Sequence, residues 1–247
     1  MTSLALSDMF WQNGCPMKTA QKILGIDSNA KTAKGVKLNY STAIIYLSPS
    51  DISGKNLCPH ASDGCRTACL NTSGRGAMQP TQTARLKKTY FFLNERETFI
   101  LQLKQEIHAF LRTSAKKGMT PCVRLNGTSD LPWHNIGNIM QEFSHVQFYD
   151  YTPNVERMIQ YLRGELPSNY HLTFSRKENN DAQCQLILSM GGNVAVVFDK
   201  LPDTWNGYPV VNGDESDLRF LDSKNVVVGL TAKGKGKKDS SGFVIKI

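Results

Sequence analysis

Short apolar segments recur at a regular interval along this chain, and their spacing constrains the fold more than any other feature of the sequence. The middle four segments start about 23–25 residues apart, which is the length of one strand followed by one helix. Such alternation is typical of a parallel sheet, and right-handed crossovers allow that sheet to curl into a barrel. The sequence therefore predicts an α/β fold, a single-domain partial (β/α)6 barrel of the TIM type. The six predicted strands are residues 41–47, 122–125, 146–149, 170–174, 194–198 and 226–230.

Helical patterns fill most of the intervals between these segments. Residues 77–117 carry the longest one, with a break expected near Asn94. Residues 199–225 have no apolar helical stripe and predict a long loop. Three shorter helices are expected at residues 136–143, 155–162 and 181–190.

No linker or low-complexity segment divides the chain. We therefore expect one domain at residues 41–247, preceded by an N-terminal extension at residues 1–40. No apolar run approaches the roughly 18 residues that span a bilayer, and no Lys or Arg precedes Lys18, so a secretory signal and a membrane anchor are not expected. The sequence predicts a cytoplasmic protein.

The charge balance is basic. Lys and Arg number 29 against 21 Asp and Glu, which gives a net charge of +8. The excess is spread out, with its densest parts at Lys31 to Lys37 and at Lys233 to Lys238. A solvated basic surface is the main interpretation, and nucleic-acid contact is the alternative.

Three cysteines within 12 residues form the strongest local motif. Cys58, Cys65 and Cys69 fall in a Gly-containing loop after the first predicted strand. The loop has no Cys-x-x-Cys pair, which disfavours a zinc knuckle. Three thiolates suit a [4Fe-4S] cluster in which one iron lacks a cysteine ligand. Zinc with His60 as the fourth ligand and three free thiols remain the alternatives.

Polar residues follow the ends of the predicted strands. Because the carboxyl ends of parallel strands meet at one edge of a sheet, we expect these side chains to line a pocket above the cluster that binds a small polar ligand. Three of them are expected to be catalytic, namely Asp130, Asp199 and Lys233. Five are expected to bind the cofactor, namely Asn126, Ser129, Asp150, Ser175 and Arg176.

A cluster held by three cysteines after the first strand of such a barrel is similar in layout to radical S-adenosylmethionine (SAM) enzymes. That resemblance implies SAM bound at the open iron, held by the polar residues named above. The spacing of Cys58, Cys65 and Cys69 is six and then three intervening residues, whereas three and then two are usual in those enzymes. An iron–sulfur protein without SAM chemistry, acting in electron transfer or nucleic-acid binding, is the alternative.

Long motifs along nearly the whole chain resemble a phage-borne family, the gene-product-eighty-eight-like proteins. Among them are LCPHASDGCRTACLNTSGRG (57–76), VRLNGTSDLPW (123–133) and VVGLTAKGKGKKDSSGFV (227–244). The resemblance implies a phage or prophage protein acting in the cytoplasm of a bacterial host, and it supplies no substrate. Shorter resembling stretches are residues 146–154, 169–176, 193–199 and 213–222.

An acidic run between the last two predicted strands has two interpretations. Asp214, Glu215, Asp217 and Asp222 provide either a hard-cation or acid–base site, or turn and cap carboxylates. The sequence contains no phosphate-binding loop and no dinucleotide-binding fingerprint in a strand–helix context, which excludes those common nucleotide folds.

Overall fold

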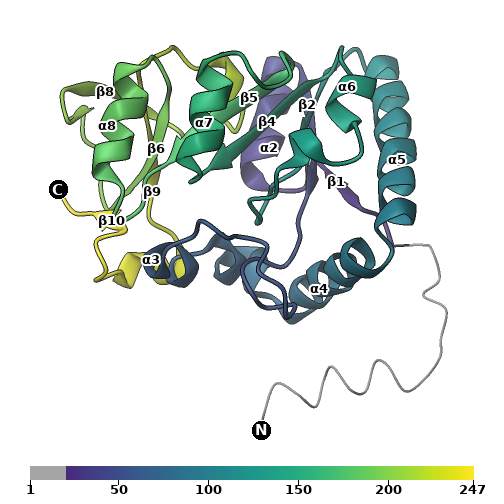
Figure 1. Ribbon diagram of the computed structural model, residues 1–247, viewed down its shortest axis with the longest axis horizontal. Coiled ribbons are helices and arrows are strands. Elements are labelled where there is room, and N and C mark those ends of the chain that lie inside the picture. Colours follow the sequence, from purple (N-terminus) through teal and green to yellow (C-terminus); the bar gives the residue numbers. More distant parts are fainter. Residues whose placement is uncertain (1–20) are drawn as a thin grey trace, which may run out of the picture.

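The computed structural model describes residues 21–247, which form an α/β fold around one mixed sheet (Figure 1). The strands lie in the order β1-β2-β3-β4-β5-β6-β9-β8-β7, and β10 pairs with the end of β6. The strands are β1 (Leu24–Ile26), β2 (Tyr40–Ile45), β3 (Thr120–Arg124), β4 (Gln147–Thr152), β5 (Tyr170–Ser175), β6 (Val194–Phe198), β7 (Thr204–Trp205), β8 (Tyr208–Asn212), β9 (Val227–Thr231) and β10 (Val244–Ile245).

The six predicted strands are β2, β3, β4, β5, β6 and β9, and all of them are parallel to their neighbours in this series. The predicted α/β class and parallel sheet are therefore confirmed. The sheet is open rather than closed, with β1 and β7 at its two ends, so a complete TIM barrel does not form. Both end strands run antiparallel to their neighbours.

Helices lie on both faces of the sheet and below one of its edges. In Figure 1, α6, α7 and α8 lie in front of the sheet, α5 stands at its right-hand end, α2 lies behind it, and α3 and α4 lie below it. The helices are α2 (Ala30–Gly35), α3 (Asp63–Thr67), α4 (Gln79–Asn94), α5 (Arg96–Lys116), α6 (Ile139–Glu142), α7 (Val155–Leu162) and α8 (Asp181–Ser189). Single 3-10 turns are η1 (Val36–Leu38), η2 (Leu70–Thr72), η3 (Gly74–Ala77), η4 (Trp133–Asn135), η5 (Arg219–Leu221) and η6 (Gly234–Lys238).

The predicted helices match these elements except at two places. The break near Asn94 is present, because Glu95 leaves the helical conformation with φ −130° and ψ 52°. The helix predicted at residues 136–143 shrinks to α6, since Gly137 and Asn138 both adopt positive φ. The long loop predicted at residues 199–225 contains β7 and β8, which form a hairpin at the edge of the sheet. Short edge strands bury few side chains and leave a weak apolar pattern.

Part of the predicted N-terminal extension belongs to the sheet. Residues 1–20, including Cys15, lie outside the part of the chain that the structure describes. The backbone N–H groups of Ile23 and Leu24 donate to the Glu106 carboxylate on α5, at 2.8–3.0 Å. This contact holds the start of β1 against α5, and β1 itself pairs with β2. None of the helices in residues 21–247 combines the length and the apolar character that crossing a membrane requires.

The two faces of the sheet are chemically different. Side chains alternate along each strand, and one set, with Val123, Phe148, Leu172 and Val196, joins the main apolar core under the helices. The opposite set is largely polar and is covered by residues 213–222. There Asp217 is buried and accepts hydrogen bonds from Arg124 at 3.0 Å and from the Tyr149 hydroxyl at 3.1 Å.

We expect Asp217→Ala to lower the free energy of unfolding by about 3–5 kcal/mol, because it leaves the Arg124 guanidinium buried without a counterion. Urea unfolding followed by circular dichroism measures this loss. The matched variant Arg124→Met with Asp217→Leu removes both charges and is expected to lose much less. Equal losses in the two variants would contradict the assignment of the cost to an unpaired charge.

Candidate functional site

The cysteine loop, residues 46–78, crosses the carboxyl edge of the sheet. The Cys58 thiol donates to the carbonyl of Thr128, after β3, at 3.6 Å. The Gly64 N–H donates to the Glu178 carboxylate, after β5, at 2.9 Å. The Lys177 ammonium donates to the His60 carbonyl at 2.9 Å. The loop that follows β2 is thus fastened to the loops that follow β3 and β5.

Within residues 21–247, the thiols of Cys58, Cys65 and Cys69 form no disulfide and are half-buried. Burial raises the pKa of Cys58 to about 11, and the neighbouring Cys69 raises it further. Burial raises the pKa of Cys65 to about 12, with Cys69 and Cys58 acting in the same direction. All three cysteines lie in the loop that follows β2, and their joint ligation of one cluster stays a prediction.

A separate cation lies near each thiol and opposes the effect of burial. Arg66 lowers the pKa of Cys58, Lys177 lowers that of Cys65, and Arg85 of α4 lowers that of Cys69. Three cations around three thiols would compensate the charge of a metal–thiolate group. In residues 21–247, no three His, Cys, Asp or Glu side chains are arranged around a single metal position.

Two buried donors beside the thiols have no hydrogen-bond partner among the described residues. They are the Ser50 hydroxyl and the Arg85 Nε–H. The Ser50 backbone N–H already donates to the Cys58 sulfur at 3.3 Å, which places this residue at the thiol. Unpartnered buried donors are costly, and the sulfides of an anionic cluster are acceptors that would satisfy them. The donors beside the thiols are therefore of the kind that an iron–sulfur group would need.

A polar pocket of about 310 Å³ adjoins this loop. It lies between the cysteine loop, the segment after β3 and the first turns of α7. Asp130 lines it and is also close enough to Cys58 to raise the pKa of that thiol. The pocket is lined by Asn56, Pro59, His60, Asp130, Leu131, Pro132, His134, Asn154, Glu156, Arg157 and Gln160.

Arg157 of α7 holds Asp130 in this pocket. Its guanidinium donates to Asp130 Oδ1 at 2.5 Å, and the Thr152 hydroxyl donates to the same oxygen at 3.0 Å. Both side chains of the ion pair are 5% exposed. The second oxygen, Oδ2, has no partner among the described residues. Burial raises the pKa of Asp130, and Arg157 opposes this effect.

Three of the predicted cofactor-binding residues form a buried network beneath the pocket. Asp150 accepts from the Asn126 backbone N–H at 2.8 Å and from the Tyr170 hydroxyl at 3.1 Å. Asn126 in turn accepts from the Ser129 hydroxyl at 2.9 Å. This network shapes the turn after β3, and none of Asn126, Ser129 and Asp150 lines the pocket.

The other predicted rim residues lie away from the pocket. The Ser175 carbonyl accepts from Asn180. The Arg176 guanidinium is buried against Asp181, at 2.8 Å, and against backbone carbonyls near the C-terminus. Asp199 is exposed and accepts from the Ile247 N–H at 3.1 Å. Their strands end at the expected edge, but the side chains of Arg176 and Asp199 bond to other parts of this chain.

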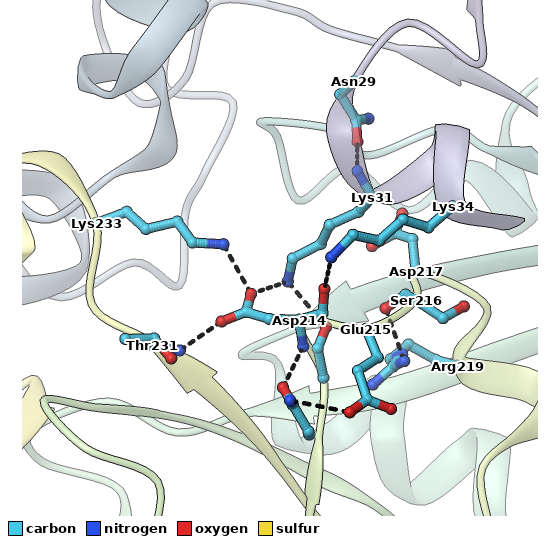
Figure 2. Close-up of polar contacts among 12 residues, drawn as sticks. Asn29, Lys31, Lys34, Asp214, Glu215, Ser216, Asp217, Arg219, Thr231 and Lys233 are labelled. Carbon is cyan, nitrogen blue, oxygen red and sulfur yellow. Dashed lines mark hydrogen bonds and ion pairs between the residues drawn. The ribbon is translucent and has the colours of Figure 1, made fainter.

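Lys233 points away from the pocket as well, toward Asp214 (Figure 2). Its ammonium lies 2.7 Å from Asp214 Oδ1, and the Lys31 ammonium lies 2.9 Å from the same oxygen. Other carboxylates of the acidic run also form ion pairs with Lys and Arg side chains of this chain, since Asp217 pairs with Arg124 and Asp222 lies 3.1 Å from Arg219. This arrangement favours the structural interpretation of the run over a cation site.

Sequence reasoning missed three pocket residues on α7, namely Glu156, Arg157 and Gln160. The signal was present in the chain. A helix that follows a parallel strand starts at the carboxyl edge, and residues three apart on it share a face. Glu156, Arg157 and Gln160 occupy the first turns of that helix, which begins after the Asn154 cap.

One family model, described as gene product 88, matches residues 18–247. No curated protein and no solved structure matches the chain.

Asp150 predicts a specific pH dependence of stability. Burial raises its pKa to about 7 in the folded state, against about 3.9 when unfolded. The folded state then binds the proton more tightly, so this group lowers stability as the pH rises from about 5 to 8, by roughly 2–3 kcal/mol.

Asp150→Asn removes this titration, so we expect its unfolding free energy relative to the unmodified protein to improve by that amount between pH 5 and 8. Urea unfolding of both proteins at each pH provides the measurement. Because all other titrating groups are shared, their contributions cancel in the difference. Parallel pH profiles would contradict the assignment.

Proposed function

The chain belongs to the gene product 88 family, and we propose that it is an iron–sulfur protein in which Cys58, Cys65 and Cys69 hold one [4Fe-4S] cluster. The observation that carries this proposal is that one loop at the carboxyl edge of a parallel sheet holds three half-buried thiols, none of them in a disulfide within residues 21–247 and each with its own neighbouring cation. When bound, such a cluster supplies one-electron chemistry. Ser50 and Arg85 would donate to it.

The order of the parallel strands supports the finer fold proposal. From β2 to β9 the six predicted strands lie side by side in the same order as along the chain. A doubly wound sheet reverses its order at a switch point, whereas a β/α barrel does not. We therefore propose that this open sheet is an incomplete (β/α)6 barrel of the radical-SAM type.

The polar pocket supports the proposal that a small polar ligand binds beside the cluster. A three-cysteine cluster leaves one iron without a protein thiolate, and the pocket adjoins Cys58 through Asn56, Pro59 and His60. Two carboxylates, Asp130 and Glu156, line it and suit an ammonium group or ribose hydroxyls. SAM carries both kinds of group and is the proposed ligand. We also propose that the protein acts in the cytoplasm of a bacterial host cell.

We expect replacement of Cys58, Cys65 or Cys69 by Ala to abolish the brown chromophore and most of the bound iron and sulfide, because each thiolate is a cluster ligand. The measurement is iron, sulfide and zinc analysis with visible absorption after anaerobic purification. Cys122→Ala and Cys184→Ala are the controls, since both residues are buried thiols outside the loop. Full iron content in the triple variant, or stoichiometric zinc in the unmodified protein, would contradict the proposal.

For the pocket, we expect calorimetric titration of the cluster-loaded protein with SAM to show binding that weakens at least about tenfold in Asp130→Asn, because its carboxylate no longer holds the ammonium group. Glu156→Gln tests the same pocket at an exposed position that does not support the fold. Asp199→Asn is the matched control, because that carboxylate lies elsewhere on the carboxyl edge.

Binding that is unchanged in Asp130→Asn and Glu156→Gln would contradict the pocket assignment. Absence of binding to the unmodified, cluster-loaded protein would contradict the SAM proposal. SAM binding without SAM cleavage on reduction would leave an iron–sulfur protein that is not a radical SAM enzyme.

A further inference from the structure

A basic surface, defined as Arg66, Arg75, Lys233, Lys235, Lys237 and Lys238, lies beside the cysteine loop. All six side chains are exposed. Two are on the cysteine loop and four are on or next to η6, which comes from the other end of the chain. In Figure 1, the yellow C-terminal segment that carries η6 lies beside α3.

Two glycines bring these segments together. Gly236 packs close to Ala68, so that a Cβ atom there would lie 3.5 Å from the Ala68 Cβ. A Cβ at Gly234 would lie only 2.6 Å from Ser73, and Gly234 also has φ +53°. Any other residue at position 234 would be strained and would push the turn away. The basic surface is therefore continuous across two distant parts of the sequence.

Three nearby carboxylates, those of Asp214, Asp239 and Glu178, are held by hydrogen bonds to this chain, whereas Asp63 of α3 is exposed. Asp214 accepts from Thr231 N–H and from two lysines, as Figure 2 shows. Asp239 accepts from the backbone of Ser241 and Val244, at 3.3 and 3.0 Å. Glu178 accepts from Ser62 and Gly64.

Within residues 21–247, none of the cations of η6 and the cysteine loop other than Lys233 has an ion-pair partner. Lys235, Lys237 and Lys238 of η6 and Arg66 and Arg75 of the loop make no ion pair in that range. The charges of Lys235, Lys237, Lys238 and Arg75 are available to an external anion, while Arg66 also neighbours the Cys58 thiol.

We propose that this basic surface binds the phosphate backbone of a nucleic acid without sequence preference. Its contacts are point charges on flexible stems, which position a protein on phosphates and read no base. The turn Gly234–Lys238 carries no apolar side chain, whereas a protein partner needs buried apolar anchors at the centre of the interface. The net charge of +8 adds long-range attraction for a polyanion.

The test measures binding of fluorescein-labelled DNA to the full chain by fluorescence anisotropy. The probes are a single strand of about 20 nucleotides and the corresponding duplex, titrated between about 50 and 200 mM salt. The triple variant Lys235→Ala, Lys237→Ala and Lys238→Ala is expected to bind at least about tenfold more weakly at the lower salt. Its log–log salt slope is expected to fall by about 2 for the single strand and about 3 for the duplex, because three phosphate contacts are lost.

The matched control is Arg112→Ala with Lys116→Ala and Lys117→Ala. These residues are exposed at the end of α5, where the chain enters β3 at the amino edge of the sheet. The control removes the same three charges, so it is expected to retain nearly all binding. Equal losses in the two triple variants would show that net charge alone binds DNA, and absence of binding by the unmodified protein at the lower salt would also overturn the proposal.

A competition arm separates nucleic acid from an acidic protein. Unlabelled DNA is expected to displace the probe at a much lower charge concentration than poly-glutamate does. Equal displacement would assign the surface to acidic proteins instead. All of these substitutions leave Cys58, Cys65 and Cys69 in place, so the outcome is independent of whether the chain holds a cluster.

Discussion

The parallel pairing of β2, β3, β4, β5, β6 and β9 is the constraint on which the rest of this structure depends. Because these strands run in one direction, every loop that follows a strand emerges at the same edge of the sheet. The cysteine loop after β2, the Asp130 turn after β3 and the Glu178 segment after β5 meet there for that reason. An antiparallel sheet with the same apolar segments would send alternate loops to opposite edges.

Burial makes this edge chemically unusual. The thiols of Cys58, Cys65 and Cys69 resist ionisation because they are removed from water, and other thiols add to this effect at Cys58 and Cys65. A bound metal reverses this balance, since thiolates are the ligating form. In the proposed cluster, the donors of Ser50 and Arg85 that lack a partner among the described residues would find an acceptor.

On the opposite face of the sheet, charged side chains pair with one another. Arg124 meets Asp217 in a buried pair, and Lys31 and Lys233 meet Asp214 nearer the surface. These pairs hold residues 213–222 against the sheet. The cations of the basic surface other than Lys233 differ, because none of them makes an ion pair within residues 21–247.

The sequence alone determined the positions of the six parallel strands, the extent of α7 and the placement of three cysteines at one edge. These features depend on the local periodicity of apolar residues and on chain direction, and both can be read directly from the sequence. Tertiary structure alone decided which polar residues meet. Asp130 lies in the pocket, where Arg157 pairs with it. Arg176 pairs with Asp181 and Lys233 pairs with Asp214, and neither lines the pocket. Each of these pairings depends on the distance between different segments of the folded chain, and the spacing of residues along one strand does not predict that distance.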